Sequence, residues 1–250
     1  MYPELFRIPG IGVTITSFGP MLALAFLAGL AITARGMKEK GYETDPVITA
    51  WMYAVVGGVF GSKLYFALDN WILYGQPFSQ LFFARGGITW YGGLIGGTLA
   101  GAIGAYRHGL SVRDLANCAA PAAAVGQALG RIGCFLVGDD YGRASDVPWA
   151  IAFPEGAPPT LETVHPTQLY ECAWLLPVAL LLWSRRNRSP FLFGEYIALN
   201  GLGRIVIENW RVNPEVALGL TEPQWIGVAL VSLGISSWLY FRFSPQAVQR

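Results

Sequence analysis

The sequence predicts an all-α polytopic membrane protein with about seven transmembrane helices, and two observations support this fold class. Hydrophobic residues make up 53% of the 250 residues and charged residues only 13%, whereas a soluble domain carries about 25% charged residues. The hydrophobic residues also gather in repeated runs of about 20, the length at which a helix crosses the hydrocarbon core of a bilayer. No internal repeat or soluble segment interrupts the pattern. Residues 1–250 are therefore expected to form a single integral membrane domain.

The seven apolar runs differ in how clearly they predict a helix. The first is long and is followed by a basic loop, so it is expected to be retained rather than cleaved as a signal peptide. The fourth is the weakest, because Pro121 and several glycines interrupt it. The fifth begins at Pro166, and proline suits the first turn of a helix, where no hydrogen-bond donor is needed. The expected helices are 17–35, 46–68, 89–106, 114–137, 166–184, 192–210 and 223–241.

The 17 lysine and arginine residues predict the orientation of these helices, because cytoplasmic loops are enriched in them. With the N-terminus outside, the inside segments hold Arg35, Lys38, Lys40, Arg107, Arg113, Arg185, Arg186, Arg188, Arg242 and Arg250. The outside segments then hold only Arg7, Arg85, Arg143 and Arg211. This bias favours an N-terminus outside and a cytoplasmic C-terminus. The net charge of +1 argues against binding of nucleic acid.

Two arginines in the middle of predicted helices are the strongest indication of a functional site. Arg131 lies in GQALGRIGCF and Arg204 in ALNGLGRIVIEN. An arginine near the bilayer centre costs about 2.5–3.5 kcal/mol on insertion scales, so its side chain normally faces a protein interior or a wet cavity. Its planar fork of donors suits a phosphate or a carboxylate. Together with Lys63, the arginines indicate an anion site; the alternative is a structural ion pair between Arg204 and Glu208, one helical turn later.

Two further segments are unusual for membrane helices. The glycine-rich segment 86–97, which includes Gly92 and Gly93, lies at the outer entrance to the third predicted helix. Its glycines indicate either close helix packing or a backbone that approaches a ligand. Polar residues also gather at 138–146 and in the run His165–Glu171, which opens the fifth helix. The cysteines have neither disulfide nor zinc-site spacing; they are Cys118, Cys134 and Cys172.

Five motifs, taken in chain order, resemble the prolipoprotein diacylglyceryl transferase family. They are YGGLIGG at 91–97, GRIGCF at 130–135, GDDYGR at 138–143, HPTQLYE at 165–171 and GRIVIE at 203–208. The resemblance covers most of the chain and implies a seven-helix enzyme of the bacterial inner membrane, with its active site toward the outer face. It also implies transfer of diacylglyceryl from phosphatidylglycerol to the lipobox cysteine of a prolipoprotein, with release of glycerol phosphate and without a metal or cofactor.

The resemblance implies roles for individual residues. Arg131 and Arg204 match functional arginines and are expected to hold the headgroup and the leaving phosphate of phosphatidylglycerol. Fixed donors of this kind lower the barrier by stabilising charge as it develops. Glu208 is expected to orient Arg204, and Lys63 stands where many relatives have arginine. The further substrate-binding candidates in or beside the motifs are Gly92, Gly93, Cys134, Gly142, Gln168, Tyr170 and Asn200.

Four positions depart from the family pattern. Many members have tyrosine at the positions of Phe18 and Asn200, histidine at Tyr91 and asparagine at Cys134. A tyrosine with an ordinary pKa of about 10 is a poor base at neutral pH. Tyr91 is therefore expected to donate a hydrogen bond or to line the pocket, unless nearby cations lower its pKa strongly. The phosphate-binding side matches the family better than the acceptor side, as in a divergent branch.

His165 and Cys134 each allow two interpretations. The imidazole of His165 has an ordinary pKa of about 6.5, which suits a catalytic base near neutrality; alternatively, it caps the fifth helix and anchors the outer loop. Cys134 is either a thiol activated by Arg131 or a small apolar filler beside Gly133. The sequence leaves both pairs open.

The sequence supports three functions, of which transfer to prolipoproteins is the first. The second is transfer of diacylglyceryl to another thiol or hydroxyl acceptor, because four positions are altered. The third is a non-catalytic protein that binds or transports an anionic lipid, with Arg131 and Arg204 binding phosphate without chemistry. Release of glycerol phosphate separates the two enzymes from the third function.

Overall fold

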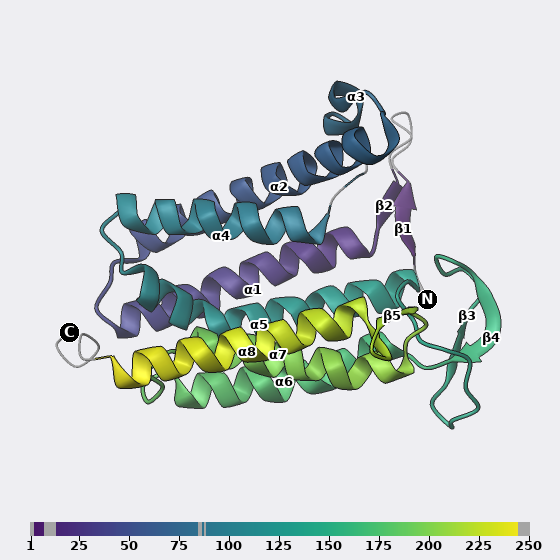
Figure 1. The fold of residues 1–250 in the computed structure, drawn as a ribbon. Coiled ribbons are helices and arrows are strands. Elements are labelled where there is room, and N and C mark those ends of the chain that lie inside the picture. Colours follow the sequence, from purple (N-terminus) through teal and green to yellow (C-terminus); the bar gives the residue numbers. More distant parts are fainter. Residues whose placement is uncertain (1–2, 8–13, 85–86, 88, 245–250) are drawn as a thin grey trace. The chain divides into compact units, whose positions relative to one another are not determined.

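The computed structural model describes residues 3–7, 14–84, 87 and 89–244, most of which are helical (Figure 1). The long helices are α1 Phe18–Glu39, α2 Thr44–Tyr74, α4 Trp90–Arg107, α5 Val112–Val137, α6 Thr167–Arg185, α7 Leu192–Ile207 and α8 Glu222–Phe243. Two shorter helices are α3 Phe78–Phe82 and the 3-10 helix η1 Glu208–Trp210. Strands pair as antiparallel hairpins: β1 Glu4–Arg7 with β2 Thr14–Thr16, β3 Ile151–Phe153 with β4 Thr160–Val164, and β5 Glu215–Ala217 with β6 Leu220–Thr221.

The predicted helices are present, whereas the smaller elements were not predicted. The range 192–210 ends as an α-helix at Ile207 and continues as η1. Pro121 lies inside an unbroken α5, which agrees with the tolerance of membrane helices for proline. The hairpins and α3 were missed because they lie outside the long apolar runs that identify membrane helices. The chain is therefore mostly helical, with one small hairpin before α1 and two in the connections between helices.

Four of the described helices are long and apolar enough to cross a membrane, namely α1, α2, α5 and α8. Large apolar side chains are exposed on these helices, for example Leu27, Val56 and Leu233. Extensive exposed apolar surface marks a membrane or protein contact. The helices and this surface together indicate an all-α membrane protein.

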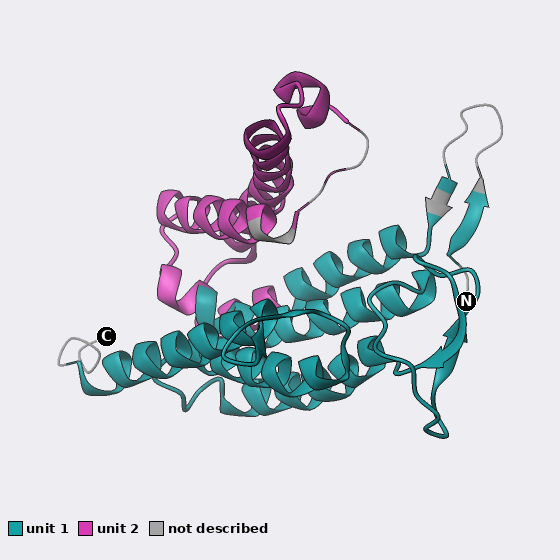
Figure 2. Cartoon of the chain, turned by 45° about the vertical axis from the view of Figure 1, so that its right-hand side comes forward, with its two compact units in different colours: residues 1–32, 116–250 teal, residues 33–115 magenta. Residues whose placement is uncertain are grey.

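The chain divides into two compact units, which Figure 2 distinguishes by colour. Unit 1 comprises residues 1–32 and 116–250, and unit 2 comprises residues 33–115. Unit 1 holds most of α1 and α5 together with α6, α7 and α8, while unit 2 holds α2, α3 and α4. Each unit has its own internal packing.

In unit 2, α2 and α4 pack backbone against backbone. A Cβ atom on Gly61 would lie 2.3 Å from the carbonyl oxygen of Gly92 and 2.9 Å from the Cα of Gly96. Beside this contact, Ser62 Oγ donates to the Thr89 carbonyl over 2.8 Å, and Thr89 Oγ1 donates to the Ser62 carbonyl over 3.1 Å. Small residues permit such close approach of membrane helices. The glycines of the YGGLIGG motif therefore have a packing role.

In unit 1, α5 to α8 pack around small and aliphatic side chains. A Cβ on Gly201 would lie 2.5 Å from the carbonyl oxygen of Gly227, so α7 and α8 also approach closely. α8 begins with a capping box, in which the Thr221 hydroxyl and the Gln224 amide oxygen each accept from the other residue's backbone N–H. The buried core that joins α5, α6 and α7 consists of Ala120, Ala124, Val178, Ala179, Leu182 and Leu192.

Two connections of unit 1 meet at one end of its helices (Figure 1). Residues 138–166 link α5 to α6 and include the β3–β4 hairpin, and residues 208–221 link α7 to α8 and include η1 and the β5–β6 hairpin. The backbone N–H of Arg143 in the first connection donates to the carbonyl of Trp210 in the second over 2.9 Å. Side chains from both connections therefore gather around the ends of α5 and α7 and the starts of α6 and α8.

Gly61→Ala is expected to destabilise unit 2. The added methyl group would overlap the backbone of α4, and overpacking of this kind costs about 1–3 kcal/mol. Thermal unfolding of the purified protein in detergent should show a lower midpoint for this variant. Gly58→Ala is the matched control, because its methyl would lie 3.4 Å from the carbonyl oxygen of Gly93. Equal midpoints for the two variants would contradict the close packing of α2 and α4.

Candidate active site

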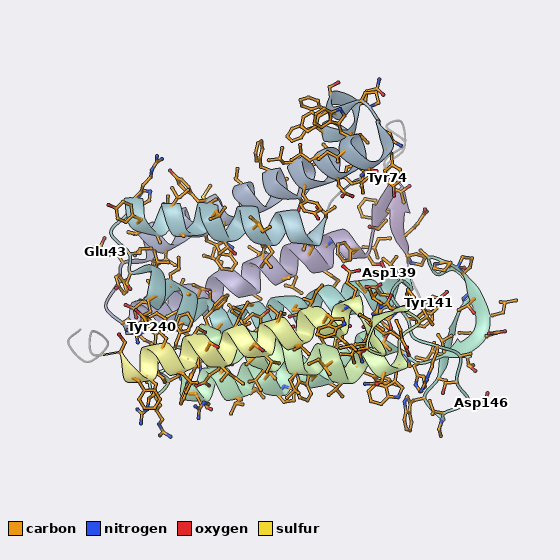
Figure 3. All side chains as sticks on the ribbon, viewed as in Figure 1. Glu43, Tyr74, Asp139, Tyr141, Asp146 and Tyr240 are labelled. Atoms are coloured by element: carbon orange, nitrogen blue, oxygen red, sulfur yellow. The ribbon has the colours of Figure 1, made fainter. Side chains whose placement is uncertain are left out.

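The end of α5 places an acidic turn next to Arg131. Gly138 follows the helix with a φ of 77°, in the left-handed region that favours glycine, and its N–H donates to the carbonyl of Cys134 over 2.8 Å. Asp139, labelled in Figure 3, comes next. Asp140 then has a φ of 60°, and its Oδ2 accepts a hydrogen bond from Nη1 of Arg131 over 2.7 Å.

Glu171 of α6 holds three arginines together. Its Oε2 lies 2.6 Å from Nε of Arg131, and its Oε1 lies 3.1 Å from Nη1 of Arg204. The same Oε1 lies 3.7 Å from Nη1 of Arg211, which follows η1. The Glu171 side chain is only 6% exposed, and a buried carboxylate requires such partners. One carboxylate therefore joins α5, α6, α7 and the connection after α7.

Two more carboxylates complete this group. Oδ1 of Asp140 lies 2.8 Å from Nη2 of Arg211, and Oε2 of Glu208 lies 3.4 Å from Nη2 of Arg204. Oε1 of Glu208 accepts hydrogen bonds from Asn213 and from the Thr221 hydroxyl before α8. We refer to the three cations and three anions as the arginine–carboxylate cluster: Arg131, Arg204, Arg211, Asp140, Glu171 and Glu208.

The pKa values of the two aspartates in the turn are shifted in opposite directions. Burial by itself raises the pKa of Asp140, but Arg211 and Arg131 outweigh it and hold the pKa below its ordinary value. For Asp139, burial raises the pKa above its ordinary value, and within the described part of the chain its Oδ1 has no hydrogen-bond partner. Asp140 is therefore firmly ionised at neutral pH.

The cluster can bind an anion and still keep its framework. Arg131 uses Nε and Nη1 in the ion pairs above, and Arg204 uses its two Nη atoms. A guanidinium carries five N–H donors, and these two side chains are 19% and 23% exposed. Donors therefore remain for a phosphate or carboxylate, whose oxygens match the planar fork.

The predicted site residues Gly142 and Gln168 hold the acidic turn in place. The N–H of Gly142 donates to the carbonyl of His165 over 2.8 Å. A Cβ on Gly142 would lie 2.3 Å from the carbonyl oxygen of Trp210, so a larger residue does not fit. Gln168 is fully buried, and its amide nitrogen donates to the backbone carbonyl of Asp139. Both residues fix the backbone that supports the cluster.

His165 and Tyr170 belong to an aromatic group beside the cluster. Nδ1 of His165 lies 2.9 Å from the hydroxyl of Tyr170, which also accepts from Nε1 of Trp149 over 2.7 Å. Both rings pack against Trp210, and the four side chains help to line a cavity of about 500 Å³. Among the described residues, no side-chain capping hydrogen bond is made at Pro166, the N-cap residue of α6. Burial and the charge of Arg143 lower the pKa of His165, so its ring is neutral at pH 7.

Two positions that depart from the family pattern lie on the helices that carry the cluster. Cys134 follows Arg131 on α5, and its Sγ lies 3.9 Å from Nη1 of that arginine. Asn200 lies on α7, where its amide nitrogen donates to the Tyr196 hydroxyl over 3.0 Å and to Oε1 of Gln127. Cys134 therefore contacts the cluster directly, whereas Asn200 joins α7 to α5 through a polar network.

The remaining predicted site residues lie in unit 2. Nζ of Lys63 donates to a backbone carbonyl in the connection between α3 and α4. Gly92 and Gly93 pack against α2, where a Cβ on Gly93 would lie 2.6 Å from Oγ of Ser62. Tyr91 is the second residue of α4, and its side chain lies outside the described part of the structure. Within unit 2, Gly92 and Gly93 therefore support the packing of α4 on α2, and Lys63 of α2 binds the connection before α4.

Sequence reasoning did not select three members of the cluster, namely Asp140, Glu171 and Arg211. Asp140 and Glu171 do lie inside the GDDYGR and HPTQLYE motifs. Arg211 entered the sequence prediction only as one of the four arginines expected in the outside segments. A usable signal was the presence of acidic residues in the same motifs as the buried arginines, since a buried cation requires a partner. Their pairing depends on contacts between residues up to 71 positions apart.

Comparison with known proteins identifies the family. The family model for prolipoprotein diacylglyceryl transferase matches residues 3–240. The chain belongs to the prolipoprotein diacylglyceryl transferase family. Proteins named phosphatidylglycerol–prolipoprotein diacylglyceryl transferase from Trichormus variabilis and Clostridium tetani are 34% and 30% identical to it, over 96% and 98% of this chain and 93% and 100% of theirs. A third of that name, from Paenarthrobacter aurescens, is 30% identical over 97% of this chain and 86% of its own.

In this transferase, Glu171→Gln is expected to lower the free energy of unfolding by about 3 kcal/mol, because removing one partner leaves buried charge uncompensated. Denaturation in detergent measures the change. Glu162→Gln is the matched control, since Glu162 is exposed on β4. A Glu171→Gln protein as stable as the control would contradict the central place of Glu171 in the cluster.

In the folded transferase, the titration midpoint of His165 should lie below about 6.5, the ordinary pKa of histidine. Nuclear magnetic resonance of ring-labelled protein measures this midpoint, and His108 is the only other histidine. Arg143→Gln removes one cause of the shift and should raise the midpoint; an unchanged midpoint would rule out a contribution of that charge. The folded-state pKa of His165 is lowered, so this residue contributes to stability in full at pH values above its pKa in the unfolded chain. The contribution is lost as the pH falls from the unfolded-state pKa to the folded-state pKa.

Proposed function

We propose that this transferase moves the diacylglyceryl group of phosphatidylglycerol to the lipobox cysteine thiol of a prolipoprotein and releases glycerol phosphate. Relatives that align over nearly the whole chain carry this donor and acceptor in their names. We place the protein in the bacterial inner membrane with seven spanning helices, its N-terminus outside and its C-terminus in the cytoplasm, on the bias of lysine and arginine. In that orientation the arginine–carboxylate cluster lies toward the outer face.

The observation that carries the proposal is the convergence of Arg131, Arg204 and Arg211 on Glu171. Arg131 and Arg204 are more exposed than Arg211, so we assign these two to the phosphate of the donor. Their carboxylate partners hold the guanidinium groups in fixed orientations. Donors that are already oriented need little reorganisation as charge develops on the leaving group.

The chemistry is a displacement at the glycerol carbon that carries the phosphate. The thiolate of the acceptor cysteine forms a bond from sulfur to this carbon, and the bond from the carbon to the phosphate oxygen breaks. The electron pair leaves with glycerol phosphate, where Arg131 and Arg204 stabilise the added negative charge. Glu208 and Glu171 act as positioning residues, since they contact the arginines. Gly142 and Gln168 support the turn beside them.

Arg131→Gln and Arg204→Gln are each expected to reduce turnover of phosphatidylglycerol by about 100-fold or more, the usual effect of removing a donor to a developing anion. Lysine at either position should restore turnover only in part, because it supplies charge without the bidentate fork. Arg35→Gln, at an arginine that is 72% exposed on α1, serves as the control and should keep turnover. Near-normal turnover in both glutamine variants would refute the phosphate assignment.

The assay uses purified protein in phosphatidylglycerol liposomes with a lipobox peptide and its Cys→Ser control. Peptide mass and released glycerol phosphate are measured together. A diacylglyceryl-modified cysteine peptide with matching release supports the proposal. Release without modification of the peptide would indicate another acceptor, a possibility that the departures at Cys134 and Asn200 raise. A folded sample that binds the lipid and gives neither product would indicate a non-catalytic lipid-binding protein.

A further inference from the structure

Asp140 lies between Arg131 and Arg211, and the first of these is also assigned to the phosphate of the donor. Its Oδ2 lies 2.7 Å from Nη1 of Arg131, and its Oδ1 lies 2.8 Å from Nη2 of Arg211. The carboxylate thus bridges two guanidinium groups, as the oxygens of a phosphate do. Arg131 is one of the two residues assigned to the donor phosphate, and a bidentate phosphate uses two neighbouring nitrogens of one guanidinium. Glu171 holds Nε of Arg131, so the phosphate needs Nη1 and competes there with Asp140.

Among the three carboxylates of the cluster, Asp140 is the one that water reaches. Its side chain is 46% exposed, against 6% for Glu171 and 0% for Glu208. A carboxylate that leaves its partners for water recovers hydration, whereas a buried carboxylate that loses its partners does not. An entering anion therefore displaces Asp140 at a lower free-energy cost than either glutamate.

The charges balance in this exchange. The cluster holds three arginines and three carboxylates. The phosphodiester of phosphatidylglycerol carries one negative charge, as the Asp140 carboxylate does. Replacing one by the other leaves the cluster neutral, and it leaves Glu171 and Glu208 in place to orient the arginines.

The backbone of Asp140 is held independently of its carboxylate. Its carbonyl oxygen accepts from Nη1 of Arg211 over 2.9 Å and from Oγ1 of Thr167 over 2.8 Å. The side chain can therefore rotate away while the turn stays fixed. The φ of 60° is tolerated by asparagine and is favourable for glycine, so both substitutions suit this backbone.

We propose that Asp140 is an internal counter-anion that the phosphate of the lipid donor displaces, and that it thereby sets the affinity of the transferase for phosphatidylglycerol. This inference rests on the function proposed above. Asp140 weakens donor binding because its contacts must be broken first, and it keeps the arginines paired while the site is empty.

The test compares the KM for phosphatidylglycerol in mixed micelles, at saturating lipobox peptide, between the wild type, Asp140→Asn and Asp140→Gly. Both variants should lower KM by at least about threefold, because an exposed ion pair no longer opposes binding. The inhibition constant of added glycerol phosphate should fall in parallel. Asp146→Asn, at an exposed carboxylate of the same connection, is the control and should change neither constant. In an Arg211→Gln background, Asp140→Asn should lower KM by less.

An unchanged or higher KM in folded Asp140→Asn and Asp140→Gly proteins would overturn the inference, since a residue that only braces Arg131 weakens binding when it is lost. A shift confined to glycerol phosphate would overturn the assignment to the lipid donor. Arg131→Gln separates this failure from failure of the proposed function. If that variant loses turnover while Asp140→Asn leaves KM unchanged, only the inference fails; if Arg131→Gln keeps turnover, the proposed function fails as well.

Discussion

The buried carboxylate of Glu171 is the interaction on which the site end of unit 1 depends. It contacts arginines from α5, from α7 and from the connection after η1. Three guanidinium groups this close repel one another, and a carboxylate between them turns that repulsion into attraction. Because a buried charge tolerates little displacement from its partners, Glu171 also fixes how α5, α6 and α7 are placed along one another at this end.

Helix packing elsewhere in unit 1 brings Glu171 and the arginines together. Glycines at the α7–α8 interface and small side chains between α5 and α6 bring the helices close enough for their ends to share side chains. The turn at 138–142 is then held by backbone hydrogen bonds, by Gln168 and by the lack of a side chain at Gly142. The three arginines and the two buried glutamates therefore sit on a rigid frame, which suits the proposed stabilisation of charge on the leaving phosphate.

Unit 1 places two groups of different chemical character next to each other. The arginine–carboxylate cluster is charged and partly open to water. His165, Tyr170 and Trp149 form a neutral aromatic group around a cavity beside it. Neighbouring residues of one short motif serve both groups, because Tyr170 and Glu171 are adjacent on α6 and their side chains make different contacts. The HPTQLYE motif, one of the five that resemble the family, therefore supplies side chains to both groups.

The sequence by itself determined the membrane class and the places of the long helices, and it singled out Arg131 and Arg204, because hydrophobic runs and charges within them are local properties. It also determined the family, through five motifs in order. Only the tertiary structure decided that Glu171, Asp140 and Arg211 complete the site, that His165 joins an aromatic group, and that Gly92 and Gly93 pack against α2. These outcomes depend on which distant segments meet and on which side chains are left in water. Such contacts follow from close packing and charge pairing across helices, which no local pattern of residues encodes.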